Sequence, residues 1–291
     1  MGKYSIKELE RLSGIRAHTI RIWEKRHNLV NPKRSQTNIR FYSDDDLKKI
    51  INVSVLNNHG VKISKIASLS LEEINKKVAE LSESQNSVEI HIEQLILAMI
   101  DMEEERFDEI LGSLSLKFGF ERTLLEIVYP FLEKIGVLWL TDNITPAQEH
   151  FIANLIRNKV IVATDSLPRP GKGARSVVLY LPENELHEIG LLFYCYLCKK
   201  EGLRTYYLGQ TVPYLSLKSV CEAHRPNFII SSFTSQPAAH AVQDYVNRLA
   251  ADFSDVTVLL TGHALKKTVI KLPANVHLFT KVLAIKDLVS K

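Results

Sequence analysis

The sequence has few cysteines and no long apolar stretch. The three cysteines, Cys195, Cys198 and Cys221, are too few for a disulfide framework and are typical of a reducing compartment. Cys195 and Cys198 form a C-x-x-C pair, but no second pair completes a zinc site, and the apolar residues around them predict a buried helix. No basic start leads into an apolar cleavable segment, and no run of ~18 uncharged apolar residues occurs. We therefore expect a cytoplasmic protein with no membrane span.

Composition and charge are informative about class. With 45% hydrophobic and 24% charged residues, the 291-residue chain is typical of a globular protein with two or three domains. Residues 1–42 contain ten Lys and Arg against three Glu, a net charge of +7, whereas the whole chain carries +4. A local positive field of this kind favours contact with nucleic-acid phosphates, although a small solvated domain can be basic without that role.

Residues 1–80 have the pattern of a winged helix-turn-helix domain. Ser5 and Glu8 have the capping-box spacing of a first helix, and a second helix is expected at about 17–26 after a Ser-Gly turn. Turn residues then flank a short extended segment at 39–42, the wing, and the pattern afterwards is helical.

Two further parts follow a polar break at 82–87. Residues 88–166 contain helical candidates whose number and spacing predict a four-helix bundle: 88–102, 104–117, 120–137 and 146–165. After a proline-containing linker, residues 174–291 alternate apolar runs with helical stretches. The expected strands are 176–181, 205–208, 228–231 and 256–260. The alternation of apolar strands and helices predicts a doubly wound, Rossmann-like parallel sheet that binds ligands beyond the carboxyl ends of its strands.

One set of spaced residues suggests a cofactor site in this last part. Glu185-Leu186-His187-Glu188-Ile189-Gly190 is followed after 41 residues by Ser232-Phe233-Thr234 and after 27 more by Gly262. A histidine at fixed distances from a small-residue strand end and a glycine suggests an imidazole presented to a large flat cofactor. Glu185 can bind the far nitrogen of His187 and fix its tautomer.

The N-terminal part closely resembles the MerR family of transcription regulators. The matching segments are Tyr4-Ser5-Ile6-Lys7-Glu8-Leu9, Ser13-Gly14-Ile15, Thr19-Ile20-Arg21-Ile22-Trp23-Glu24, Pro32-Lys33-Arg34 and Asn38-Ile39-Arg40-Phe41-Tyr42-Ser43. The resemblance implies a recognition helix in the major groove, a wing on the DNA backbone, and binding as a dimer to a near-palindromic site. The residues placed to contact DNA are Arg16, His18, Thr19 and Arg21 on the second helix, and Arg34, Arg40 and Tyr42 in the wing. Ile20 and Trp23 are expected in the core.

The C-terminal part resembles the cobalamin-binding domain of corrinoid methyltransferases and mutases, whose pattern is Asp/Glu-x-His-x-x-Gly, Ser-x-Leu/Thr and Gly-Gly. The resemblance implies that His187 replaces the cofactor's own base as the lower axial ligand of cobalt. Ser232 and Gly262 then leave open the slot that accepts the displaced base, and Gly190 and Thr234 complete the motifs. The chain departs from the pattern at His263, which stands where the second glycine is expected.

A third motif lies between the MerR-like part and the part that resembles a cobalamin-binding domain. Trp139, nine residues and then Glu149-His150 match a signature of the light-sensing cobalamin repressors within the MerR family. The resemblance implies that Trp139 packs over the adenosyl group of adenosylcobalamin and that Glu149 and His150 line the same pocket. It also implies a tetramer in darkness that falls apart when light breaks the Co–C bond, after which His150 can take the vacated position.

The predicted function is therefore a non-enzymatic transcriptional repressor that binds double-stranded operator DNA as a homodimer or homotetramer and senses light through adenosylcobalamin. Methylcobalamin is the alternative cofactor. Three other functions remain open: a cobalamin sensor that does not use light, a corrinoid methyl carrier, which the basic N-terminal part disfavours, and a DNA-binding regulator whose cofactor pocket has decayed.

Overall fold

The computed structural model describes residues 3–35, 38–84, 87–139, 144–234, 239–266, 270–280 and 284–290. These ranges form two compact units, Met1–Ile152 and Ala153–Lys291. The division of the first unit into a DNA-binding domain and a bundle stays a prediction. No helix within the described ranges combines the length and apolar character needed to cross a bilayer.

The chain begins as a winged helix-turn-helix. Its elements are α1 (Ile6–Ser13), α2 (Ala17–His27), β1 (Lys33–Arg34), β2 (Arg40–Phe41) and α3 (Asp44–Asn58). Ser5 and Glu8 form the expected capping box of α1, and Gly14 ends that helix with φ of 71°, a left-handed conformation that glycine adopts at little cost. The antiparallel strands β1 and β2 form the wing, and Tyr4 pairs with Tyr42 beside them.

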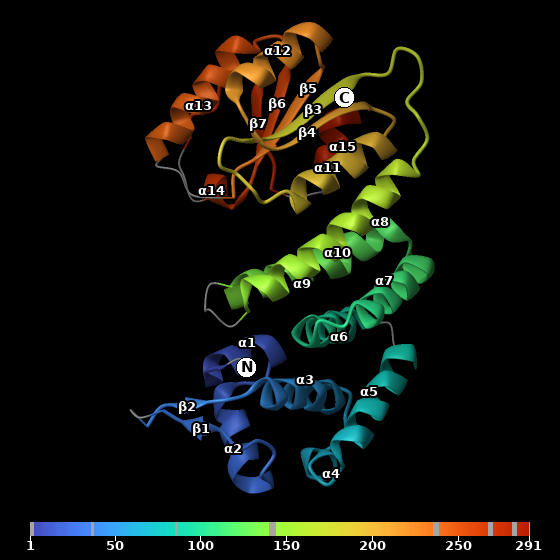
Figure 1. Ribbon diagram of the computed structural model, residues 1–291, viewed down its shortest axis with the longest axis vertical. Helices are drawn as coiled ribbons and strands as arrows, with labels where there is room; N and C mark the ends of the chain where they lie inside the picture. The colour runs from blue at the N-terminus through green and yellow to red at the C-terminus, as the bar shows by residue number, and fades with distance from the viewer. Residues whose placement is uncertain are drawn as a thin grey trace. The chain divides into compact units, whose positions relative to one another are not determined.

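Seven α-helices and one π-helical turn of the described residues complete the first unit and lead into the second (Figure 1). They are α4 (Ile63–Ile66), α5 (Leu71–Ser84), α6 (Val88–Asp101), α7 (Glu104–Phe118), α8 (Phe120–Thr123) with the π-helical turn η1 (Leu124–Val128) and α9 (Tyr129–Trp139), and α10 (Pro146–Asp165). The four predicted bundle helices are confirmed, with a π-helical turn inside the third. The polar break was predicted to begin at residue 82, but α5 continues to Ser84.

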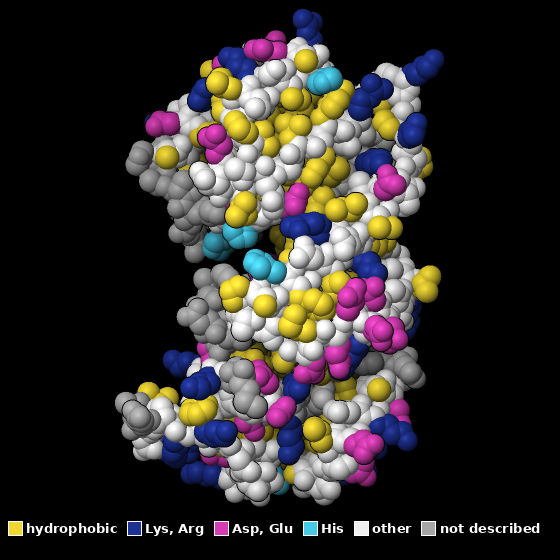
Figure 2. Space-filling model, viewed as in Figure 1, with side chains coloured by type: hydrophobic (Ala, Val, Ile, Leu, Met, Phe, Trp, Pro, Cys, Tyr) yellow, Lys and Arg dark blue, Asp and Glu magenta, His cyan; other side chains and the backbone are white. Residues whose placement is uncertain are grey.

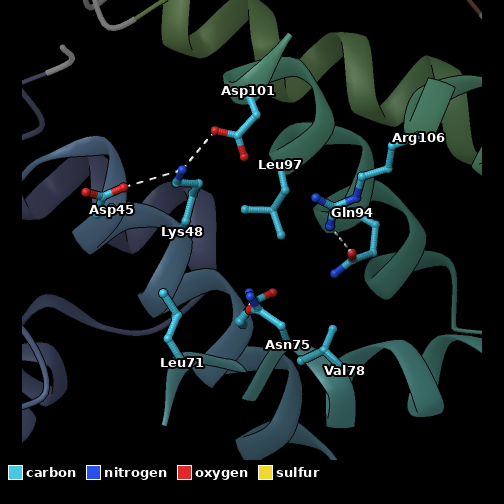
Figure 3. A pocket seen from close by; sticks show the side chains of 10 residues that line it. Asp45, Lys48, Leu71, Asn75, Val78, Gln94, Leu97, Asp101 and Arg106 are labelled. Carbon is cyan, nitrogen blue, oxygen red and sulfur yellow. Dashed lines mark hydrogen bonds and ion pairs between the residues drawn. The ribbon is translucent and has the colours of Figure 1, made fainter. Parts of the chain in front are cut away.

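Polar side chains separate α3 and α5 from α6 and α7 (Figure 3). Lys48 lies between two carboxylates, with its Nζ 2.8 Å from Asp101 Oδ1 and 3.4 Å from Asp45 Oδ1. Across the same cavity of about 320 Å³, Arg106 donates to Gln94 Oε1 over 2.7 Å. Elsewhere on α6 the buried side chains are mainly apolar, with His91 and Glu93 as buried polar exceptions.

The second unit is a doubly wound α/β domain. Its elements are β3 (Ser176–Pro182), α11 (Ile189–Lys200), β4 (Arg204–Val212), α12 (Tyr214–His224), β5 (Phe228–Ser232), α13 (Ala239–Asp252), β6 (Thr257–Thr261), α14 (His263–Lys266), β7 (Val276–Leu278) and α15 (Ala284–Ser290). All strand pairs are parallel, in the order β4-β3-β5-β6-β7. Helices α12 and α13 cover one face of the sheet, and α11 and α15 cover the other (Figure 1). The four predicted strands are confirmed.

The strand order reverses direction between β3 and β5. In such sheets the loops that leave these two neighbouring strands diverge to opposite faces and open a crevice at the carboxyl edge. The loop after β3 contains His187, and Thr234 follows β5. The fold therefore brings the first two predicted cofactor motifs to the position where ligands of doubly wound domains bind.

Candidate cofactor site and DNA-binding surface

His187 lies on the loop between β3 and α11, with 62% of its side chain exposed. Its Nδ1 is 2.5 Å from Oε1 of Glu185, which is buried. A carboxylate on Nδ1 fixes the imidazole tautomer and raises the basicity of the other nitrogen, so a metal would be coordinated through Nε2. This is the arrangement expected from the Glu-x-His spacing.

Glu185 also joins the two strand ends at the switch point. Its second oxygen, Oε2, accepts a hydrogen bond of 2.8 Å from the backbone N–H of Thr234. One buried carboxylate therefore orients His187 and fixes the segment after β5, where Ser232 is also buried. Gly190 lies in the first turn of α11 on the same side of the sheet, so the first two predicted motifs meet.

Gly262 follows β6 and is required by the backbone itself. Its φ of 117° is rarely adopted by other residues, and a Cβ there would lie 2.1 Å from the carbonyl oxygen of Phe233. The segments that follow β5 and β6 are hydrogen-bonded to each other. Phe233 N donates to Thr261 O over 2.8 Å, and Ala264 N donates to Phe233 O over 3.0 Å. His263, the departure from the glycine pair, begins α14 with its side chain exposed, so it does not fill the core.

The bundle motif presents a second imidazole beside a carboxylate. On α10, His150 Nδ1 lies 2.9 Å from Glu149 Oε2, and 71% of the His150 side chain is exposed. Trp139 is the last residue of α9, and its side chain lies outside the described residues. As in the Glu185–His187 pair, Nδ1 is the engaged nitrogen.

The expected recognition helix α2 presents its predicted polar residues to solvent. Arg16, the N-cap residue, and His18 and Arg21 are exposed, and Thr19 is half-buried. Ile20 and Trp23 of the same helix are buried, as predicted. In the space-filling view, Lys and Arg side chains gather around the wing and α2 (Figure 2). This surface has the charge and shape that a major-groove reader needs.

The prediction that Tyr42 contacts DNA is wrong. Its side chain is fully buried, and its hydroxyl donates to Glu24 Oε2 over 3.3 Å. Burial and the neighbouring Glu24 raise the pKa of Tyr42 to about 12. Arg40 turns the same way, with Nε 3.4 Å from Glu24 Oε1, whereas Arg34 is exposed and donates to Asn38 Oδ1. Side chains two residues apart share one face of a strand, so Arg40 and Tyr42 both approach α2.

Sequence reasoning missed three residues that hold the His187 loop. The carboxylate of Glu188 accepts a hydrogen bond of 2.8 Å from the Tyr207 hydroxyl, and its other oxygen is 3.2 Å from Arg157 Nε of α10. Burial and this hydrogen bond raise the pKa of Tyr207 well above its ordinary value, so its hydroxyl stays a donor. No sequence signal marks the three, because they come from separate elements.

Comparison with known proteins matches two family models to the first part of the chain. Residues 4–73 match the family model of MerR HTH family regulatory proteins, and residues 91–163 match that of the B12 binding domain. The HTH-type transcriptional repressor CarH of Myxococcus xanthus is 29% identical over 252 residues, covering 84% of each chain. CarA of the same organism is 27% identical over 230 residues, covering 78% of this chain and 75% of its own.

Among solved structures, the monomethylamine corrinoid protein of Methanosarcina barkeri superposes with a TM-score of 0.54 at 14% identity, over 66% of this chain and 93% of its own. At that identity the likeness shows the fold alone.

The two matched family models and the repressor relatives support a cobalamin-binding transcription regulator. The chain fits a MerR-family regulator of this composition, and the predicted combination of the two domains is confirmed.

Proposed function

We propose that this regulator is a repressor that senses light through adenosylcobalamin, with His187 as the lower ligand of cobalt and Trp139, Glu149 and His150 on the adenosyl side. Bound adenosylcobalamin would supply a cobalt–carbon bond that light breaks. The observation that carries the proposal is the pairing of each imidazole with a carboxylate, Glu185 with His187 at 2.5 Å and Glu149 with His150 at 2.9 Å.

The donor chemistry of this chain fits a cobalamin. One exposed imidazole, oriented by a buried carboxylate, is the form in which histidine binds a metal. Ser232 and Thr234 follow on the neighbouring strand, and the close approach of backbone at Gly262 explains why a glycine is needed there. Gly262 is thus required by the fold itself, whereas a Cβ added at Gly190 would meet no protein atom within 4 Å.

In this proposal light changes the assembly of the protein and leaves the contacts of each protomer with DNA unchanged. A tetramer engages more half-sites than a dimer, so its dissociation removes an effective-concentration advantage worth on the order of 10²-fold in apparent affinity. Arg16, His18, Thr19, Arg21, Arg34 and Arg40 would keep their contacts throughout. Release of the operator then needs no change in the recognition helix.

The test is size-exclusion chromatography of the protein with adenosylcobalamin in darkness and after green illumination, with absorbance read at cobalamin wavelengths. Co-elution of corrin with a species that shrinks on illumination is the expected result. His187→Ala should lose corrin, and His150→Ala should retain dark binding but give a less durable photoproduct. His277→Ala, an exposed histidine on β7, is the control. Bound corrin without a size change would refute light sensing and favour a light-independent cobalamin sensor.

A further inference from the structure

Glu188 follows the predicted cobalt ligand directly, at a position of the first cofactor motif where any residue is allowed. Only 16% of its side chain is exposed. Its Oε1 accepts from the Tyr207 hydroxyl over 2.8 Å, and the backbone at Gly209 lies so close that a Cβ there would be 3.5 Å from the same oxygen. Its Oε2 lies 3.2 Å from Arg157 Nε, an ion pair that lacks the angle of a hydrogen bond. A carboxylate this buried is stable only with such partners.

These contacts fix one end of the loop that presents His187, and other contacts fix the rest. Gln210 Nε2 of β4 donates to the carbonyl of Leu186 over 2.6 Å. At the opposite end, Glu185 accepts from Thr234 N. The loop is therefore attached to β4, to the end of β5 and, through Arg157, to α10, while the His187 side chain between these attachments stays exposed.

Arg157 is part of the helix that also carries the second imidazole. It lies seven residues after His150 on α10, which is about two helical turns, so both side chains leave the helix on the same face. Arg157 is itself oriented, because its Nη1 donates to Asn154 Oδ1 over 2.6 Å. The contact with the His187 loop is therefore made by the part of α10 that belongs to the second unit.

We propose that Arg157 is a positioning residue which, through Glu188, sets the orientation of the His187 loop and couples it to α10. A displacement of α10 then moves the predicted cobalt ligand. This coupling rests on the proposed function only for the identity of the bound group, since the contacts themselves lie within the protein. It adds a link between α10 and the loop of His187 that the sequence motifs do not contain.

The test compares Arg157→Met, Arg157→Lys, Glu188→Gln and the double variant Arg157→Met/Glu188→Gln in the full-length protein. The control is Asn158→Ala, an exposed neighbour on α10. The first readout is hydrogen–deuterium exchange of residues 183–192 without cofactor. Arg157→Met should speed exchange of this segment roughly tenfold, the order expected for loss of one charged contact, and Arg157→Lys should restore part of the protection.

The second readout is the absorbance spectrum of adenosylcobalamin added in darkness, which differs with and without a nitrogen ligand below cobalt. Arg157→Met should shift bound corrin toward the form that lacks this ligand. The double variant should be no worse than Arg157→Met, because both changes break one link. Unchanged exchange in Arg157→Met, or fully additive effects in the double variant, would overturn the proposal. If the wild-type protein binds no corrin, the proposed function fails, and the exchange data still decide whether Arg157 holds the loop.

Discussion

Replacing Gly262 with alanine should disrupt the α/β domain before any effect on a cofactor arises. The new Cβ would lie 2.1 Å from Phe233 O and 2.5 Å from Phe233 C and N, and these are backbone atoms that cannot rotate away. A φ of 117° adds conformational strain on the order of 1–3 kcal/mol for a residue with a side chain. Forced separation of packed chain segments costs about 1–3 kcal/mol more. The expected loss is about 2–6 kcal/mol, a large part of the usual stability of a domain.

Gly190→Ala is the matched comparison. No atom lies within 4 Å of the Cβ that it would add, and the residue is helical, so stability should stay equal or rise by up to about 1 kcal/mol. Urea unfolding followed by circular dichroism measures both free energies, and titration with adenosylcobalamin measures binding. We expect Gly190→Ala to fold normally and bind corrin more weakly. A Gly262→Ala variant that loses less than about 1 kcal/mol would show that the backbone at Phe233 yields easily, and would refute the reasoning.

Three further predictions follow from the first unit. Burial raises the pKa of Glu93 to about 8, so the folded state favours its protonated form, and stability should fall between about pH 5 and pH 8. Glu93→Gln should flatten this decline in thermal melts across that range, and an unchanged slope would remove Glu93 as its cause. Lys48→Met should cost at most about 1 kcal/mol in urea unfolding, because the ion pair with Asp101 is partly exposed, and a much larger loss would contradict this weight. Arg21→Ala should weaken operator binding and lower its salt slope by roughly one, whereas an unaltered slope in fluorescence anisotropy would exclude a phosphate contact.

Local patterns predicted most element boundaries because the energies that set them are local. The capping box of Ser5 and Glu8 and the apolar periodicity of the bundle helices depend on neighbours within one or two turns. The continuous apolar runs that became β3, β5 and β6 are buried on both faces, so few other structures could accommodate them. The short strand β7 was missed because Val276–Leu278 has only its first residue buried.

The residues that sequence reasoning placed wrongly or missed depend on contacts between distant segments. Tyr42 stands beside arginines in a basic wing, which favoured a DNA contact, but pairing with Tyr4 turns it into the core. Glu188 and Arg157 are 31 positions apart by their numbers and carry no motif, yet they meet because α10 lies against the loop after β3. Only the fold can show that two charges of this kind are partners.

The two carboxylate–imidazole pairs differ in how firmly each imidazole is held, and this difference suits a switch. Glu185 is buried and holds both His187 and Thr234, so moving the His187 ring would deprive one oxygen of a buried carboxylate of its imidazole partner. The side chains of His150 and Glu149 are 71% and 35% exposed, and a pair of that exposure contributes at most about 1 kcal/mol. One imidazole is therefore fixed before a cofactor binds, and the other can change its position at little cost. Under the proposed function, in which the cofactor is retained while its upper ligand changes, this difference would let one imidazole stay in place while the other moves.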